Sequence, residues 1–167
     1  MDAFVQGLGV RAVLVASRSA ASAEALVLHA KSLGVNAQVV ADANGALVDC
    51  PLVVTCTTAQ AVVLHATPRP DAFIAAVGAF TPAMVELAPA LCQHLARQGT
   101  VVMDTRDADH EAGDLLQAEL DPAQFSALRD VLAAAALQRP GPVLFKSCGW
   151  AGWDLASARV VVGLQNT

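Results

Sequence analysis

The stretch Arg11–Ser19 does most to limit the folds open to this chain. Val13–Ala16 is a short, uninterrupted apolar run that ends in Ser17-Arg18-Ser19, and an alanine-rich segment of helical character follows at once. Such a run is typical of a buried strand in a parallel sheet that is followed directly by a helix. The stretch therefore predicts one strand–helix step of an α/β domain.

The rest of the chain continues this alternation. Strands are expected at 37–41, 51–55, 73–77, 100–103 and 143–145, and helices at 2–9, 20–34, 42–48, from Gly78 to Gly99 with a break near Pro89, at 110–120, from Asp121 to about Leu137, and from about Trp150. Strands that alternate with helices are joined by right-handed crossovers, so the sheet is mostly parallel and covered on both faces. The pattern predicts an α/β, Rossmann-like, doubly wound fold.

For the helix after the opening strand, the sequence predicts both ends and the buried face. Ser19 is a plausible N-cap, Glu24 is placed in the first turn, and Gly34 is expected to end the helix. Leu26, Ala30 and Leu33 recur at the spacing of one buried helix face.

Composition excludes several classes of function. Of the 167 residues, 55% are hydrophobic and the mean hydropathy is +0.50, yet no window approaches the roughly 20 apolar residues of a membrane span. Only ten Lys and Arg are scattered along a chain of net charge −5, so neither nucleic acid nor membrane is expected as a partner. The four cysteines and four histidines lack metal-ligand spacing, so no metal is expected. A cytoplasmic protein with reduced thiols is predicted, since no export signal precedes the first strand.

Four clusters follow predicted strands and are expected to meet in one crevice, because ligands bind outside the carboxyl ends of parallel strands. They are Ser17-Arg18-Ser19, Thr55–Thr58, Val77-Gly78-Ala79 and Lys146–Gly149. In the first, the Arg18 guanidinium matches the phosphate on the adenosine ribose of a dinucleotide, and no acid follows the strand to repel it. NADPH is therefore favoured over NADH. The alternative is that Arg18 is an ordinary solvated loop arginine.

The other clusters have open interpretations. Thr55 and Thr57 can donate to a ribose or a pyrophosphate, or simply close a turn. Gly78, next to Val77, lets the backbone approach a flat ligand. Lys146 and Ser147 can touch a nicotinamide or a substrate, although a lone lysine is more often solvated. The charged run Asp104, Arg106, Asp107, Asp109 and Glu111 is interpreted as a solvated face, and no catalytic constellation is recognised.

Several segments together resemble the ornithine cyclodeaminase/mu-crystallin family. They read VLVASRSAASAEAL, PLVVTCTT, FIAAVGAFTPAMVEL, VVMDTRDADHEAGDL and VLFKSCGWAGWDLASARVV, and the last is similar to the imine-reducing members. The resemblance implies a Rossmann domain joined to a substrate and dimerisation domain. Residues 1–149 are thus expected to form a partial NAD(P)-binding domain, and residues 150–167 a helix that packs on a domain outside this chain.

Two departures from the family pattern shape the expected function. The family places a glycine-rich GxGxxA turn just before the helix in which this chain starts, and none precedes it here. The first strand, the pyrophosphate cradle and the N-terminal substrate domain are therefore expected to be missing, as in an N-terminally truncated enzyme. Phe80 stands where cyclodeaminases have an aspartate that takes part in deamination, which favours hydride transfer over cyclodeamination.

The resemblance thus implies the C-terminal part of an NAD(P)H-dependent reductase of cyclic imines, of the Δ1-pyrroline-2-carboxylate or Δ1-piperideine-2-carboxylate type. Its cofactor-binding residues are expected to be Ser17, Arg18, Ser19, Thr55, Thr57, Val77 and Ser147. No proton donor is identified, and a complete enzyme is expected to be a homodimer. The alternatives are an ornithine cyclodeaminase-like lyase and a mu-crystallin-like fragment that binds NADPH or another small ligand without turnover.

Overall fold

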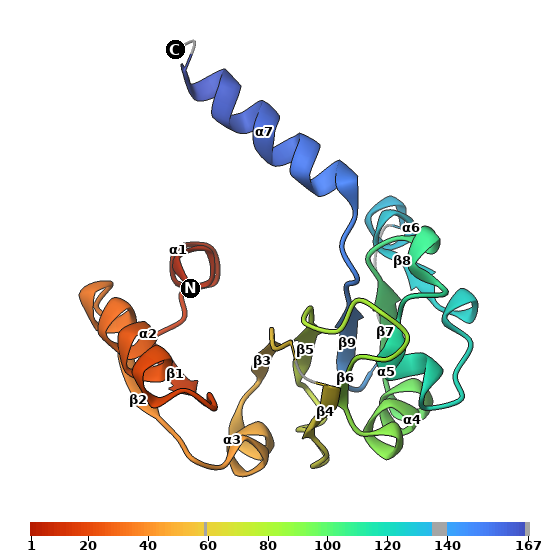
Figure 1. Ribbon diagram of the computed structural model, residues 1–167, viewed down its shortest axis with the longest axis horizontal. Helices are drawn as coiled ribbons and strands as arrows, with labels where there is room; N and C mark the ends of the chain where they lie inside the picture. Colours follow the sequence, from red (N-terminus) through yellow and green to blue (C-terminus); the bar gives the residue numbers. More distant parts are fainter. Residues whose placement is uncertain (59, 135–139, 166–167) are drawn as a thin grey trace. The chain divides into compact units, whose positions relative to one another are not determined.

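The computed structural model of the chain describes residues 1–58, 60–134 and 140–165. The chain divides into two compact units, Met1–Asp49 (unit 1) and Cys50–Thr167 (unit 2). Both units consist of parallel strands joined largely through helices (Figure 1). The predicted α/β, mostly parallel, Rossmann-like architecture is confirmed.

Unit 1 is a two-stranded parallel sheet with three helices. Its elements are α1 Asp2–Leu8, β1 Ala12–Val15, α2 Ala20–Ser32, β2 Asn36–Val39 and α3 Ala43–Asp49. The two strands pair in register from Ala12 opposite Asn36 to Val15 opposite Val39. The opening helix, the first strand and the Ser19-capped helix all form as predicted.

The buried face of α2 agrees only in part with the predicted one, since Ala30 is buried and Leu33 packs against the core of unit 1. Ala23, Val27 and Ala30 are buried against Val15, Val35 and Ala37 of the small core, whereas Leu26 is 40% exposed. Glu24 lies beyond the first turn, which contains no acidic residue, because the helix begins immediately after Ser19.

Unit 2 is organised around a five-stranded parallel sheet. Its strand order is β3-β5-β9-β7-β8, formed by β3 Leu52–Thr55, β5 Phe73–Ala76, β9 Val143–Lys146, β7 Thr100–Met103 and β8 Ser126–Ala127 (Figure 1). The registers align Thr55 with Ala76, and Ala76 with Lys146. The carboxyl ends of the three neighbouring strands β3, β5 and β9 therefore meet at one edge of the sheet. Leu144 and Ile74 in the middle of the sheet are fully buried.

The sequence did not predict a second, smaller sheet in this unit. β4 Gln60–Leu64 pairs in parallel with β6 Val85–Leu87, where a helix was expected. All three residues of β6 are buried, and two of their amides bond the Asp114 carboxylate. Pro89 begins helix α4 Pro89–Gln98 rather than breaking one, since a proline at the first helical position leaves no amide unpaired.

Two further predicted helices are shorter in the structure. The segment 110–120 contains only α5 Gly113–Leu116, preceded by the 3₁₀ turn η1 Arg106–Ala108. After Asp121, the 3₁₀ turn η2 Pro122–Gln124 leads into β8 and then α6 Leu128–Ala133. Pairing of Ser126 with Val102 interrupts the helix, because a strand added to the sheet outweighs weak local helix propensity. The predicted end near Leu137 lies outside the described residues.

The last helix, α7 Ala151–Gln165, begins where predicted. Its apolar side chains are largely exposed, among them Trp153, Leu155 and Val161 at 42%, 54% and 56%. Trp150, just before the helix, meets Trp153 edge to face with ring centres 5.7 Å apart. Packing of this helix on a further domain stays a prediction. Across the described part of the chain, no helix has both the length and the apolar character needed to cross a bilayer.

One stretch has the GxGxxA spacing but not the strand and helix that surround a dinucleotide-binding turn. Gly7-Leu-Gly9-Val-Arg-Ala12 runs from the last turn of α1 to the first residue of β1, and Gly9 ends the helix in the left-handed conformation at φ 67°. A dinucleotide turn needs the reverse order, a strand before the glycines and a helix after them. Gly9 therefore ends a helix, and the stretch does not form a pyrophosphate cradle.

Candidate functional site

The Ser17-Arg18-Ser19 turn lies at the carboxyl end of β1 and leads into α2. The Ser17 hydroxyl accepts from the Ser19 amide at 3.2 Å, and the Ser19 hydroxyl accepts from the Ser22 amide at 3.2 Å as the N-cap. Both serines and Arg18 are exposed. Within the described residues, no hydrogen bond or ion pair involves the Arg18 guanidinium. The turn thus offers a cation to solvent.

The chemical character of this turn suits an anion. A serine hydroxyl has one proton and two lone pairs, and both hydroxyls are engaged here as acceptors, which leaves their protons available. The guanidinium adds a planar set of donors, and the N-terminus of the 13-residue α2 adds the positive end of the helix dipole. Because no acidic residue lies in the first turn of α2, nothing there offsets this positive end.

In unit 2, Glu86 joins the carboxyl ends of β3 and β5. Its carboxylate is fully buried and accepts four hydrogen bonds. One oxygen receives the Thr55 hydroxyl at 2.9 Å and the Gly78 amide at 2.9 Å, and the other receives the Thr57 hydroxyl at 2.8 Å and the Thr57 amide at 2.7 Å. The two strand ends are thereby held at a fixed distance by one side chain.

The backbone at Gly78 approaches the β3 end so closely that only glycine fits. A Cβ built at this position would overlap the Thr57 carbonyl oxygen and amide nitrogen, and would come within 2.5 Å of a Glu86 carboxylate oxygen. The reason expected for this glycine was close approach of a flat ligand. The structure shows close approach of a neighbouring strand end instead.

Asp104 joins the ends of β7 and β9, as Glu86 joins those of β3 and β5. It is 5% exposed, and one of its oxygens accepts from the Ser147 hydroxyl at 2.7 Å and from the Cys148 and Gly149 amides at 2.9 Å each. The other oxygen accepts from the Thr105 amide at 2.8 Å. The assignment of Asp104 to a solvated charged face was wrong, because its four donors come from the loops that surround it.

Lys146, the last residue of β9, is also buried rather than solvated. Its ammonium forms an ion pair with Asp114 at 2.9 Å, with both side chains fully buried, and donates to the Ala79 carbonyl. The other Asp114 oxygen accepts from the Glu86 and Leu87 amides at 2.6 and 2.8 Å. A buried charge needs such partners, and this pair ties β9 to α5 and β6.

Two cysteines near this network are poor nucleophiles. Burial, with a further contribution from Asp114, raises the pKa of the Cys92 thiol to about 12. Burial likewise raises the pKa of the half-buried Cys148 thiol to about 11. Since the thiolate is the reactive form, neither thiol supplies a nucleophile at neutral pH.

The structure brings four of the seven predicted site residues together in unit 2. Thr55, Thr57 and Ser147, here called the hydroxyl rim, lie with Val77 at the carboxyl ends of β3, β5 and β9. Ser17, Arg18 and Ser19 form the turn of unit 1. Sequence reasoning missed Glu86 and Asp114 altogether. The only hint was that Glu86 is an acid within the apolar stretch Pro82–Pro89, and nothing in the sequence indicates which acid turns inward.

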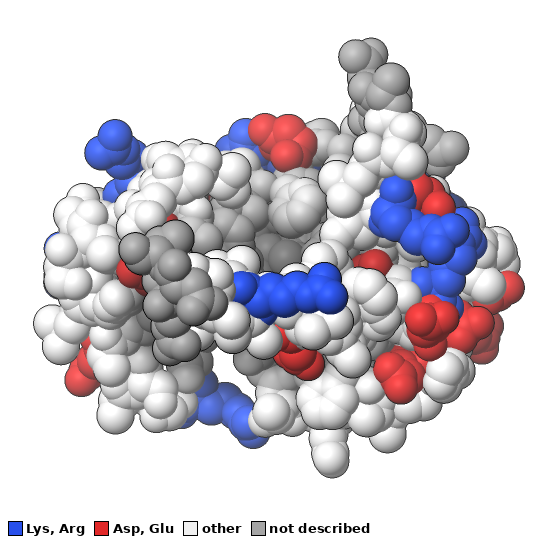
Figure 2. All heavy atoms as spheres, turned by 90° about the horizontal axis from the view of Figure 1, so that it is seen from above, with Lys and Arg blue, Asp and Glu red and all other residues white. Residues whose placement is uncertain are grey.

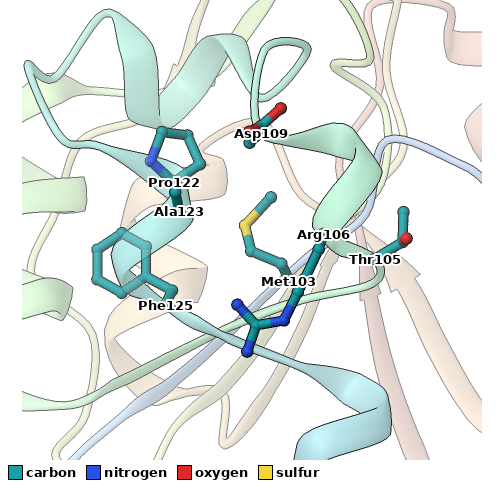
Figure 3. Close-up of a pocket in the computed structure, with 7 residues that line it drawn as sticks. All are labelled: Met103, Thr105, Arg106, Asp109, Pro122, Ala123 and Phe125. Carbon is teal, nitrogen blue, oxygen red and sulfur yellow. The ribbon is translucent and has the colours of Figure 1, made fainter.

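A small cavity of about 190 Å³ lies beside the end of β7 but contains none of the predicted residues. It is lined by Met103, Thr105, Arg106, Asp109, Pro122, Ala123 and Phe125. Pro122 and Phe125 form one wall and Arg106 approaches from the other (Figure 3). Arg106 is the one cationic side chain of this lining, and its guanidinium forms an ion pair with Asp130 at 2.6 Å.

The charged surface shows no organised patch of one sign on the face drawn in Figure 2. Uncharged residues cover most of it, and basic and acidic side chains adjoin one another. Within the described ranges, no group of three or more His, Cys, Asp or Glu is arranged to hold a metal ion.

Comparison with known sequences gives one consistent result. Residues 1–164 match the profile of the ornithine cyclodeaminase/mu-crystallin family. Δ1-pyrroline-2-carboxylate reductase 1 of Burkholderia multivorans is 38% identical over 143 residues, which cover 86% of this chain and 44% of that protein. Δ1-pyrroline-2-carboxylate reductase 2 of Burkholderia ambifaria is 41% identical over 108 residues, or 65% of this chain and 33% of that protein. The chain thus spans less than half the length of these relatives.

Solved structures agree with this result. A probable ornithine cyclodeaminase from Bordetella pertussis is 30% identical, with a TM-score of 0.68 over 84% of this chain and 46% of that one. The iminosuccinate reductase of Paracoccus denitrificans, solved with NAD⁺, shares the fold with a TM-score of 0.80 at 22% identity, over 93% of this chain and 49% of that one.

Proposed function

Because this chain belongs to the ornithine cyclodeaminase/mu-crystallin family, we propose that it forms the cofactor-binding part of an NAD(P)H-dependent reductase of cyclic imines. The substrate class proposed is Δ1-pyrroline-2-carboxylate or its six-membered homologue Δ1-piperideine-2-carboxylate. The names of the relatives support this class. Because the chain covers only part of each relative, the activity is proposed for a longer enzyme of which this chain has the C-terminal portion.

The observation that carries the proposal is the pair of polar strand ends. In unit 1, an arginine and two serines follow β1 at the N-terminus of a helix, where a phosphate is favoured. In unit 2, the hydroxyl rim lies at the carboxyl ends of β3 and β9, on either side of β5, which is where α/β domains bind ligands. We assign the phosphate on the adenosine ribose to Ser17, Arg18 and Ser19, and other cofactor contacts to Thr55, Thr57, Val77 and Ser147.

The residues of this chain would bind and orient rather than transfer protons. When bound, reduced nicotinamide supplies the hydride that converts the imine carbon to an amine carbon. The three hydroxyls of the rim direct their protons into buried carboxylates, so they do not protonate the imine nitrogen. We place the proton donor outside the hydroxyl rim.

Replacing Arg18 by alanine tests the preference for NADPH. We expect the dissociation constant for NADPH to rise about tenfold, because a charge-assisted contact with the phosphate is lost, and the constant for NADH to change less than about twofold. Fluorescence titration of both cofactors measures this. Arg11→Ala is the matched control, since Arg11 is exposed at the amino end of β1. Equal losses for both cofactors in Arg18→Ala would remove the phosphate role.

An assay of imine reduction by the longer enzyme separates this function from its rivals. With NADPH and Δ1-pyrroline-2-carboxylate, cofactor oxidation accompanied by proline formation supports the reductase. Micromolar NADPH binding without turnover favours a binding module, as in mu-crystallin-like proteins. Release of ammonia from ornithine would instead indicate the cyclodeaminase.

We further propose that the complete enzyme is a cytoplasmic homodimer. The apolar side chains that α7 exposes support a dimer interface at this helix. The four cysteines, all within the described residues, form no disulfide with one another, which suits a reducing compartment.

A further inference from the structure

The cavity beside the end of β7 has an apolar side and a polar side (Figure 3). Met103, Pro122 and Phe125 supply the apolar side. Met103 and Pro122 are buried, and Phe125 is half-buried. Arg106 and Asp109, both exposed, belong to the polar side. Among the described residues that line this cavity, none is assigned to the cofactor, so its chemistry is separate from that of the proposed function.

The elements around the cavity hold its walls in place. Met103 ends β7 in the five-stranded sheet, and Arg106 begins the turn η1, which the Thr105 hydroxyl caps. On the opposite wall, Pro122 begins the turn η2, which the Asp121 carboxylate caps. Because a strand end and two capped turns form these walls, a ligand need not order them on binding.

The ion pair with Asp130 orients Arg106 and leaves most of its donors available. Only Nη2 of Arg106 bonds to Asp130, at 2.6 Å. The same Asp130 oxygen accepts from the Ala127 amide at 3.1 Å, which holds the carboxylate at the start of α6. Within the described residues, Nε and Nη1 of Arg106 form no hydrogen bond. Since a guanidinium has five N–H donors, a carboxylate of a ligand can still be bound here.

Asp109 is the anionic side chain of the same lining. Its carboxylate pairs with Nδ1 of His110 at 2.9 Å, and this hydrogen bond lowers the pKa of Asp109. The carboxylate is therefore charged at neutral pH, and it has further lone pairs that can accept from an ammonium. In the part of the chain that the structure describes, Arg106 and Asp109 form no ion pair with each other, so each can meet an opposite charge on a ligand.

The size and charge of the cavity limit the class of ligand. Drug-sized molecules occupy sites of roughly 300–1,000 Å³, whereas a cavity of about 150 Å³ is enough for benzene. The cavity of about 190 Å³ therefore suits a compact apolar group. One cation and one anion in the lining suit a ligand with one charge of each sign. A free amino acid with a small apolar side chain has all of these properties.

We propose that this cavity binds a free α-amino acid with a compact apolar side chain. The carboxylate of the ligand meets Arg106, its ammonium meets Asp109, and its side chain packs on Met103, Pro122 and Phe125. The inference goes beyond the proposed function, because the site is built from β7, η1 and η2 rather than from the residues assigned to the cofactor.

Four small probes test the three parts of the ligand separately. L-Leucine has all three groups, isocaproate lacks the ammonium, isoamylamine lacks the carboxylate, and glycine lacks the side chain. In an NMR titration of the chain, L-leucine should shift the Thr105 and Ala123 amide signals saturably, with a dissociation constant on the order of 1 mM, as suits so small a ligand. The other three should bind at least about tenfold more weakly, because each lacks one contact.

Variants of the two charged residues locate the site. Arg106→Met and Asp109→Asn should each raise the dissociation constant for L-leucine about tenfold, through loss of a charge-assisted hydrogen bond. The matched controls, Arg129→Met and Asp107→Asn, should leave it unchanged. Arg129 also pairs with Asp130, at 3.5 Å, and Asp107 lies in η1, but neither is among the described residues that line the cavity. All four variants should retain wild-type affinity for NADPH.

Three results would overturn the inference. One is the absence of saturable L-leucine binding at roughly tens of millimolar. Another is equal affinity for L-leucine and isocaproate, because the ammonium would then have no partner. The third is an equal loss in Arg106→Met and Arg129→Met, which would place the ligand elsewhere. None of them affects the proposed cofactor function, which the NADPH titration decides separately.

Discussion

Replacing Lys146 by methionine should lower the free energy of unfolding of unit 2 by about 3–5 kcal/mol. Methionine fills a similar volume but leaves the fully buried Asp114 carboxylate without its cation. The Ala79 carbonyl also loses its donor. Because the Asp114 carboxylate also holds two amides of β6, the disturbance should reach Glu86. Urea unfolding followed by circular dichroism measures the change.

A double variant shows whether the loss comes from the unpaired charge. Lys146→Met combined with Asp114→Asn removes both charges but keeps a side-chain oxygen for the Glu86 and Leu87 amides, so it should recover more than half of the lost stability. Arg106→Met, which breaks the exposed pair with Asp130, should cost far less. A loss of less than about 1 kcal/mol in Lys146→Met would mean that the pair contributes little to the fold.

Replacing Gly78 by alanine should cost about 3 kcal/mol of stability and also weaken NADPH binding. The added methyl group overlaps backbone atoms of Thr57, which cannot move away because the Thr57 amide and hydroxyl are bonded to Glu86. The β3 and β5 ends must then separate, and the hydroxyl rim is displaced. Thermal unfolding and cofactor titration of the same variant measure the two effects.

Gly7→Ala is the matched control for Gly78→Ala. A Cβ at Gly7 meets nothing within 4 Å, and the residue lies inside α1, where alanine is the better helix former. We expect unchanged or slightly higher stability. If Gly78→Ala were equally harmless, the close approach of the two strand ends would not be a constraint on the sequence.

The sequence predicted the elements whose residues obey a local pattern. The parallel strands at 52–55, 73–76, 100–103 and 143–146 were found because apolar runs end at polar or glycine residues. Short elements were missed. β6 is only three residues long, contains a glutamate, and is stabilised by Asp114 from a segment 27 and 28 residues away. No local pattern records such a contact.

For the candidate site, the sequence predicted the polar residues that follow the strands but not the buried charged residues behind them. Thr57 and Ser147 were found because they follow strands. Glu86 and Asp114 were missed, Asp104 was interpreted as solvated, and Lys146 was expected either to touch a ligand or to be solvated. Charged residues are rarely buried, and the partners of these four come from distant segments. Glu86 and Asp104 accept from the three hydroxyls of the rim, and no local pattern in the sequence indicates these bonds.

Titration of the chain with NADPH and NADH tests the central proposal most directly. The account predicts saturable NADPH binding with a micromolar dissociation constant, and weaker binding of NADH because it lacks the phosphate assigned to Arg18. The change in cofactor fluorescence on binding reports both constants under the same conditions. Millimolar or undetectable binding of NADPH by the folded chain would contradict the proposal.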